Sequence, residues 1–132
     1  MPVDFDVNVP ATTSGLEAAL QSLDAFCDAC RLAADAARRA RIVIEELFTN
    51  TIKYGYGGEC ERPVRLAGRA DAKLLLFFED EAPPFDLTLW RAPSPVPGER
   101  VGQQGIAMVM GLCESVAYAR VAGANRISIV IA

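Results

Sequence analysis

Glu46 and Asn50, in the segment "IVIEELFTN", have the residue types and the spacing to form a site. They lie four residues apart, so a helix would place the carboxylate and the amide on one face, where they converge on a point that a ligand can occupy. Because the sequence contains no histidine, acid–base chemistry in this chain falls to carboxylates. On a helix such a pair is often only part of a solvated face, so it needs support from elsewhere in the chain.

A second group of candidates surrounds a long proline-rich segment. Asp80 ends an apolar run that is typical of a buried strand, and "VGQQG" places Gly102 and Gly105 just before a helical segment. Glycines at a helix N-terminus allow backbone N–H groups and the helix dipole to approach an anion such as a phosphate. Taken alone, this pattern is more typical of a flexible entry turn.

The use of histidine and cysteine narrows the remaining chemistry. Without histidine, the chain itself supplies no Ser-His-Asp or Cys-His nucleophile pair, no histidine metal ligand and no phosphohistidine. Cys27 and Cys30 form the pattern "CDAC", which occurs in redox and zinc sites. This pair lies deep within an amphipathic run, where cysteine is ordinarily a small buried hydrophobe. We therefore favour a structural role for both.

Length and charge indicate one domain with a protein or small-molecule partner. A chain of 132 residues has the usual size of a single domain, so we expect one unit over residues 1–132. The net charge is −4 and the arginines are scattered, which argues against nucleic acid or an anionic membrane as partner. No apolar run approaches the roughly 20 residues that span a bilayer, and the N-terminus lacks the pattern of a signal peptide. We expect a cytoplasmic protein.

Hydrophobic periodicity gives the order of the elements. Alternating apolar residues predict a first strand. Ser14 and Glu17 form a capping box at the start of a long helix, and Asp35 is a candidate cap for a second helix that carries Glu46 and Asn50. The segment 81–104 contains five prolines and no sustained periodicity, so it is interpreted as a loop. The predicted elements are strand 3–9, helix 13–33, helix 36–54, strands 63–71 and 72–80 with a turn near 68–72, the loop, a helical segment 105–116 and a hairpin over 115–132 that turns at "AGAN".

The order of these elements predicts the fold class. Strand, two helices, two strands, loop, helix and two strands are typical of an α+β domain. We expect a two-layer sandwich in which a mostly antiparallel mixed sheet carries its helices on one face. Three features then follow one another along the chain: the pair Glu46 and Asn50 comes first, Asp80 second and the glycine-rich turn third.

That order resembles the GHKL family of ATP-binding domains (the Bergerat fold). Within it, the chain is most similar to the single-domain anti-sigma-factor serine/threonine kinases. Their pattern is Glu-x-x-x-Asn on a helix, then a box like Asp-x-Gly-x-Pro-Phe, then a glycine-rich box that opens a helix. This sequence has "EELFTN", "DEAPPFD" and "GQQGIAMVMGL" in those places, and the resemblance covers nearly the whole chain. A P-loop is absent.

The resemblance implies a role for each candidate residue. Asn50 would bind Mg²⁺ through its carbonyl oxygen, and Glu46 would be the general base that accepts the proton of the attacking hydroxyl. Asp80 would accept a hydrogen bond from the exocyclic amine of adenine. The remaining residues implied to bind ATP are Ala82, Gly102, Gly105 and Ile106, and the proline-rich loop would be a lid that orders near 98–106 when Mg·ATP binds.

Two departures from the family pattern affect the expected site. Ala82 stands where the family typically has glycine, so its β-carbon is expected to restrict or shift the backbone near the base. Tyr54 stands where the kinases often have histidine, and "TIKY" is closer to the sensor histidine kinase version, in which a lysine approaches the phosphates. Lys53 is therefore a candidate phosphate ligand, and its alternative is a solvated helical lysine.

Two classes of function follow from the resemblance. The first is a kinase that binds a sigma factor and phosphorylates a serine on an antagonist protein, the anti-anti-sigma protein, in partner-switching regulation. The second is a nucleotide-binding or degenerate protein-interaction module of the same fold without kinase activity. The intact Glu46 favours the enzyme. The resemblance implies ATP and Mg²⁺ as cofactors and leaves homodimerisation open.

Overall fold

Five strands and three α-helices form the computed structural model of the chain, which describes residues 3–89 and 104–132. The predicted site residue Gly102 and most of the proline-rich loop lie outside the described residues. None of the described helices is long and apolar enough to span a bilayer. The elements are β1 (Val3–Ala11), α1 (Thr13–Ala29), α2 (Ala34–Asn50), the π-helical turn η1 (Thr51–Gly55), β2 (Cys60–Ala70), β3 (Leu74–Asp80), the 3₁₀ turn η2 (Leu87–Leu89), α3 (Gln104–Leu112), β4 (Ser115–Val121) and β5 (Ala124–Ile131).

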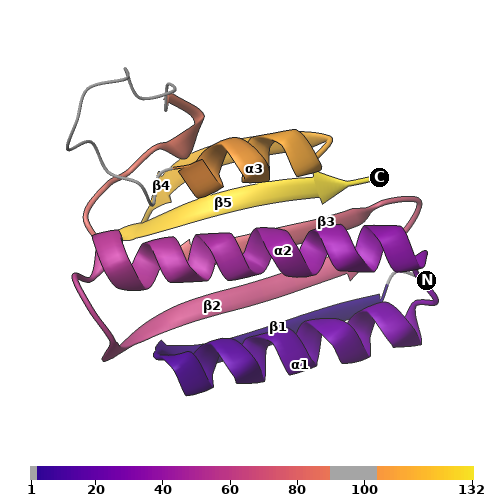
Figure 1. Cartoon of the computed structure of the whole chain (residues 1–132), viewed down its shortest axis with the longest axis horizontal. Helices are drawn as coiled ribbons and strands as arrows, with labels where there is room; N and C mark the ends of the chain where they lie inside the picture. The colour runs from indigo at the N-terminus through magenta and orange to yellow at the C-terminus, as the bar shows by residue number, and fades with distance from the viewer. Residues whose placement is uncertain (1–2, 90–103) are drawn as a thin grey trace.

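The strands form one sheet in the order β1-β2-β3-β5-β4, and the helices cover one of its faces (Figure 1). This arrangement confirms the predicted α+β two-layer fold. All four strand pairings among the described residues are antiparallel, so no parallel pair of the expected mixed sheet is found in this part of the chain. The end of α2, the start of α3 and the end of β3 lie at the same edge of the molecule (Figure 1).

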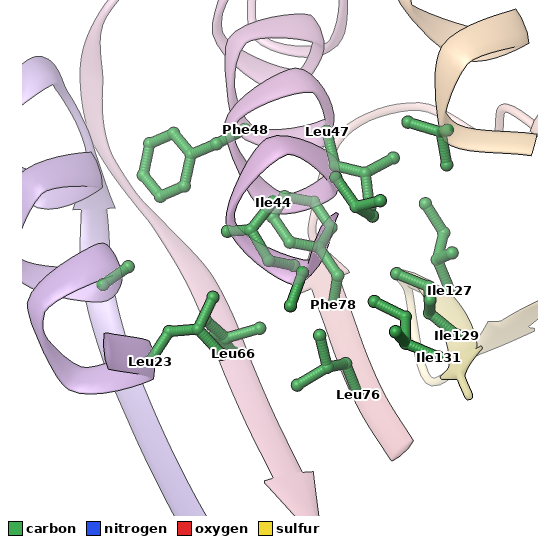
Figure 2. Packing of buried hydrophobic residues seen from close by; sticks show 14 of the residues in the cluster. Leu23, Ile44, Leu47, Phe48, Leu66, Leu76, Phe78, Ile127, Ile129 and Ile131 are labelled. Carbon is green, nitrogen blue, oxygen red and sulfur yellow. The ribbon is translucent and has the colours of Figure 1, made fainter. Parts of the chain in front are cut away.

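The core lies between the sheet and the helices. In β3, Leu74, Leu76 and Phe78 alternate with less buried residues, so one face of the strand is sealed by the helices. Phe78 meets Phe48 of α2 edge to face, with 6.3 Å between the ring centroids (Figure 2). Cys27 is part of this core, as the sequence predicted, and burial raises the pKa of its thiol to about 11.

Both long helices begin differently from the prediction. The cap of α1 is Thr12, whose hydroxyl accepts a hydrogen bond from the Gly15 N–H at 3.0 Å, and not Ser14. The cap position of α2 is Ala33, which makes no side-chain hydrogen bond. Asp35 lies inside the first turn, where it pairs with two arginines. Neighbouring residues compete for each cap, and the backbone geometry decides between them.

The predicted turn at 68–72 is also displaced. Gly68 lies within β2, opposite Phe5 of β1, and the turn follows at residues 71–73. A β-carbon at position 68 would approach the Phe5 ring to 2.4 Å. Gly68 is therefore a packing residue that makes room for an aromatic ring, and it does not mark the end of the strand.

Candidate functional site

A cavity of about 180 Å³ opens at the edge where α2, α3 and β3 end or begin. Lys53 does not line this cavity and is exposed on η1. Six of the predicted site residues line the cavity together, namely Glu46, Asn50, Asp80, Ala82, Gly105 and Ile106.

Asp80 forms the polar floor of the cavity. The residue is only 9% exposed, so the carboxylate needs hydrogen-bond donors. Oδ2 accepts from the Thr51 hydroxyl at 2.8 Å, while Oδ1 accepts from the Asn125 amide at 2.9 Å and from the Ala82 N–H at 3.2 Å. Each carboxylate oxygen has two acceptor sites, so these three bonds leave one acceptor site on Oδ2. Asp80 can therefore accept one hydrogen bond from a ligand.

The β-carbon of Ala82 lies beside a glycine that also lines the cavity. Ala82 is only 2% exposed, and a β-carbon added to Gly55 would lie 3.0 Å from the Ala82 β-carbon and 3.9 Å from Asp80 Oδ2. Ala82 is not among the described residues with positive φ, so its backbone conformation does not require glycine. Gly55 thus leaves the space beside Ala82 and Asp80 free of a further side chain.

Glu46, which also lines the cavity, lies against the first turn of α3. A β-carbon added to Gly105 would be 2.3 Å from Glu46 Oε2. The carboxylate thus occupies space that only a glycine leaves free. Among the described residues, no hydrogen bond or ion pair holds Glu46, whereas its neighbour Glu45 is 3.4 Å from the Arg41 guanidinium. The Glu46 carboxylate is therefore available to a ligand in the cavity.

Asn50, one helical turn after Glu46, presents an unsatisfied oxygen. Its Oδ1 is buried and has no hydrogen-bond partner, which is costly for a polar atom unless a ligand completes it. An amide oxygen is a suitable ligand for Mg²⁺, which keeps several waters and phosphate oxygens in its octahedron. No group of three or more Cys, Asp or Glu residues that could hold a metal exists in the described part of the chain. A single protein ligand such as Asn50 therefore suits a metal ion whose other ligands are waters and the phosphate oxygens of a bound substrate.

Sequence reasoning missed three residues that shape the cavity. Thr51 and Gly55 belong to η1, a π-helical turn that changes the direction of side chains after Asn50. Asn125 comes from β5, and it meets Asp80 because the β3–β5 register places these two residues opposite each other. No local pattern marks Asn125 as a site residue. The only available signal was its place as the last residue of the predicted "AGAN" turn.

The sequence matches the histidine kinase-like ATPase domain family over residues 9–131. The chain belongs to this family. The match includes every residue that lines the cavity. It agrees with the predicted relationship to the GHKL ATP-binding domains.

The fold is also found in a solved structure. The chain is similar to the crystal structure of the RsbU and RsbW domains of Rv1364c from Mycobacterium tuberculosis, with a TM-score of 0.69 and 13% sequence identity. The similarity covers 98% of this chain and 32% of that chain. At this identity the likeness concerns the fold. The comparison with curated proteins gave no match.

Proposed function

We propose that the chain is an ATP-dependent protein-serine/threonine kinase of the anti-sigma-factor type. The observation that carries this proposal is the meeting of Glu46, Asn50 and Asp80 around one cavity. Asp80 offers an acceptor at one end, and Glu46 and Asn50 offer a base and a metal ligand at the other. These are the groups that binding and transfer of a nucleotide phosphate require.

In the proposed complex, the base of ATP occupies the end of the cavity near Asp80. The open acceptor site on Asp80 Oδ2 takes one hydrogen of the exocyclic amine, and the apolar side chains of Leu47, Val109 and Ile127 contact the ring. Gly105, in the first turn of α3, approaches the phosphates, with Ile106 beside it. Gly102 and the lid remain parts of the proposal that lie outside the described residues.

Transfer requires a base near the γ-phosphate. The Oγ of a protein serine attacks the γ-phosphorus, the bond to the bridging oxygen of ADP breaks, and Glu46 accepts the proton of the hydroxyl. Asn50 would hold Mg²⁺, which neutralises charge on the phosphate oxygens when bound. Glu46 and Asn50 lie on one face of α2, so the same helix sets the distance between base and metal.

The proposed partners, in the cytoplasm, are a sigma factor and an anti-anti-sigma protein that antagonises this chain. Support comes from the fold shared with a structure that contains an RsbW domain and from the order of the three sequence boxes. The net charge of −4 suits a protein partner better than nucleic acid.

Two measurements test the proposal. Calorimetry should show saturable binding of Mg·ATP to the purified chain. With γ-³²P-labelled ATP and an extract of the native host, label should appear as acid-stable phosphoserine on another protein. It should not appear as an acid-labile phosphoramidate on this chain, which has no histidine. Binding without any transfer would favour the degenerate module, and no binding at millimolar ATP would refute the proposed function.

Replacing Asn50 by alanine tests the metal end of the site. We expect the Asn50→Ala variant to lose most of the affinity that Mg²⁺ adds to ATP binding, because the proposed protein ligand of the metal is gone. Titration with ATP in Mg²⁺ and in EDTA measures this difference. Thr49→Ala is the control, since Thr49 lies on the same helix outside the cavity. An undiminished effect of Mg²⁺ in Asn50→Ala would contradict the assignment.

Replacing Gly105 by alanine should move Glu46 without disturbing the fold. The new β-carbon would lie 2.3 Å from Glu46 Oε2, and the flexible end of a side chain can shift at little cost. We expect transfer to fall about 100-fold, as for a misplaced catalytic group, with no loss of thermal stability because alanine favours helix. The control is Gly111→Ala on the same helix, where a β-carbon meets nothing within 4 Å. Equal transfer rates in the two variants would contradict the role of Gly105.

A further inference from the structure

Asn125 is the most highly connected polar side chain near the cavity. Its Nδ2 donates to Asp80 Oδ1 at 2.9 Å and to the carbonyl oxygens of Pro83 and Ala82 at 3.0 and 3.2 Å. Its Oδ1 accepts from the Tyr118 hydroxyl at 2.6 Å and from the Phe85 N–H at 3.3 Å. The three acceptors lie around Nδ2 and the two donors around Oδ1, so the partners fix the orientation of the amide.

This amide has no capacity left for a ligand. Two hydrogens on Nδ2 serve three acceptors, and both acceptor sites of Oδ1 are used. Asn125 is also only 5% exposed, although it borders the cavity. It can therefore affect a bound base only through the groups that it holds, and the first of these is the Asp80 carboxylate.

The Asp80 carboxylate depends on Asn125 for its orientation. No ion pair reaches Asp80 in the described part of the chain, so three neutral donors stabilise its charge. Asn125 and the Ala82 N–H fill both acceptor sites of Oδ1, and the Thr51 hydroxyl fills one site of Oδ2. The remaining site of Oδ2 is thereby aimed at the cavity, beside Gly55. Without Asn125, Oδ1 would be left with one weak bond and the carboxylate could turn.

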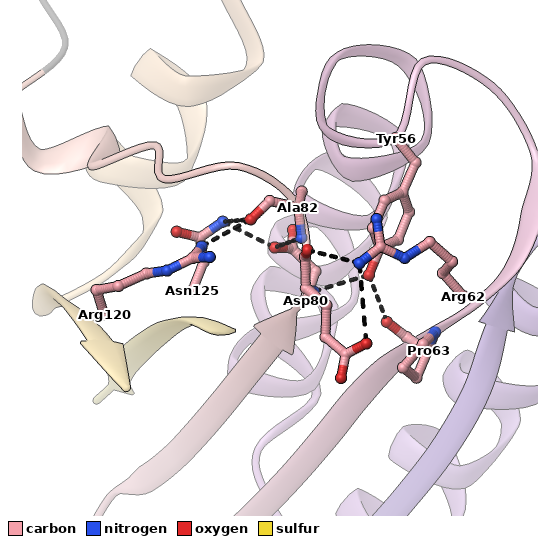
Figure 3. A network of polar contacts seen from close by, with 8 residues as sticks. Tyr56, Arg62, Pro63, Asp80, Ala82, Arg120 and Asn125 are labelled. Carbon is pink, nitrogen blue, oxygen red and sulfur yellow. Dashed lines mark hydrogen bonds and ion pairs between the residues drawn. The ribbon is translucent and has the colours of Figure 1, made fainter. Parts of the chain in front are cut away.

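The same side chain holds one side of the loop that follows Asp80. The guanidinium of Arg120, on β4, also donates a hydrogen bond to the Ala82 carbonyl oxygen at 2.6 Å. Side chains of both β4 and β5 therefore hold this loop. On the opposite side, the Tyr56 hydroxyl accepts from the Glu81 N–H, and Arg62 donates to the Glu81 carbonyl oxygen (Figure 3). The start of the predicted lid is thus clamped from both sides.

On the opposite side of the loop, the hydroxyl of Tyr56 must be protonated in order to donate a hydrogen bond, and we call Tyr56 and Arg62 the second clamp. Burial raises the pKa of the Tyr56 hydroxyl, which therefore stays protonated and donates to the Pro63 carbonyl oxygen at 2.8 Å while it accepts from Glu81. This clamp fixes residue 81 but makes no bond to the Asp80 side chain. Of the two clamps, only the one at Asn125 reaches the carboxylate itself.

We propose that Asn125 is a positioning residue that sets base recognition by fixing the open acceptor site of Asp80. This inference rests on the proposed binding of ATP, and it assigns to β5 a part in specificity. Its consequence is selective. Loss of Asn125 should remove the benefit that a ligand gains from its exocyclic amine, whereas a purely structural residue would weaken all purine nucleotides alike.

The test compares ATP with purine riboside triphosphate, which lacks the exocyclic amine. In the wild-type protein, a hydrogen bond to a charged acceptor should favour ATP by about 10- to 100-fold. In Asn125→Ala this ratio should fall to within about threefold, because the acceptor is no longer aimed at the amine. Ser128→Ala, on the opposite face of β5, is the control and should keep the wild-type ratio. Dissociation constants for both ligands are measured by calorimetry.

A milder variant keeps the proposal testable if Asn125→Ala does not fold. Tyr118→Phe removes only the hydroxyl that donates to Asn125 Oδ1 and keeps the packing of the ring, so the ratio should fall at least twofold by the loss of one neutral hydrogen bond, about 0.5 kcal/mol or more. An unchanged ratio in a folded Asn125→Ala, or in Tyr118→Phe if the first variant is unfolded, would overturn the inference. An equal loss of both ligands in the deciding variant would also overturn it. If the wild-type protein binds neither nucleotide, the proposed function fails and the inference fails with it.

Discussion

Glu46→Gln is expected to reduce phosphoryl transfer by about 10²- to 10⁴-fold, the range over which general bases contribute. The variant should bind Mg·ATP nearly as well as the wild-type protein. Glutamine has the size of glutamate and fits the same space beside Gly105, but it cannot accept the proton of the attacking hydroxyl. The variant keeps Asn50, the proposed ligand of the metal, and Asp80, the proposed acceptor for the adenine amine. Single-turnover transfer and calorimetry on the same preparation separate the two effects.

The control for this experiment is the adjacent residue of the same type. Glu45 lies outside the cavity, about 100° away around the helix, and it is 3.4 Å from Arg41 at the surface. Glu45→Gln should therefore leave both transfer and binding unchanged, because surface ion pairs contribute little. If Glu46→Gln lost binding and transfer in equal measure, Glu46 would be a structural residue of the site and not its base.

The elements of the fold could be predicted because each strand buries only one of its two faces against the helices. Alternation of apolar residues marked the strands, and the same alternation separates the sealed and open faces of β3 and β5. The closing hairpin was also predicted correctly, since its turn places Ala122 and Gly123 at φ values of 49° and 82°, as a tight two-residue turn requires. The helix caps were wrong because Thr12 and Ser14 are equally good caps in local sequence.

The candidate site could be predicted only where its residues are close in sequence or lie in recognisable boxes. Glu46 and Asn50 share a helix face, so their spacing is enough. The partners of Asp80 depend instead on the register between β3 and β5 and on the π-helical turn after Asn50. Neither feature has a local signal in sequence. The closeness of Ala82 and Gly55 was missed for the same reason, since these residues are 27 positions apart in the sequence.

Asp80→Asn is expected to reverse the preference of the site between adenine and hypoxanthine. The amide oxygen can replace Oδ1 and accept from Asn125 and the Ala82 N–H, while the amide nitrogen takes the place of Oδ2. The Thr51 hydroxyl can then accept instead of donating. An N–H of the new amide then replaces the open acceptor site of Oδ2. This N–H would face the N–H of the exocyclic amine of ATP, and two donors cannot form a hydrogen bond with each other. The exocyclic oxygen of ITP would now be the better partner.

The size of this change follows from the cost of an unmatched polar pair. ATP should lose about 10- to 100-fold in affinity, and ITP should bind the variant more tightly than ATP does. Glu79→Gln is the control, because Glu79 precedes Asp80 on the other face of β3 and pairs there with Arg65 and Arg126. A thermal melt checks that Asp80→Asn is folded. If the folded variant weakened ATP and ITP alike, Asp80 would support the cavity without reading the base, and the orientation proposed for the nucleotide would be wrong.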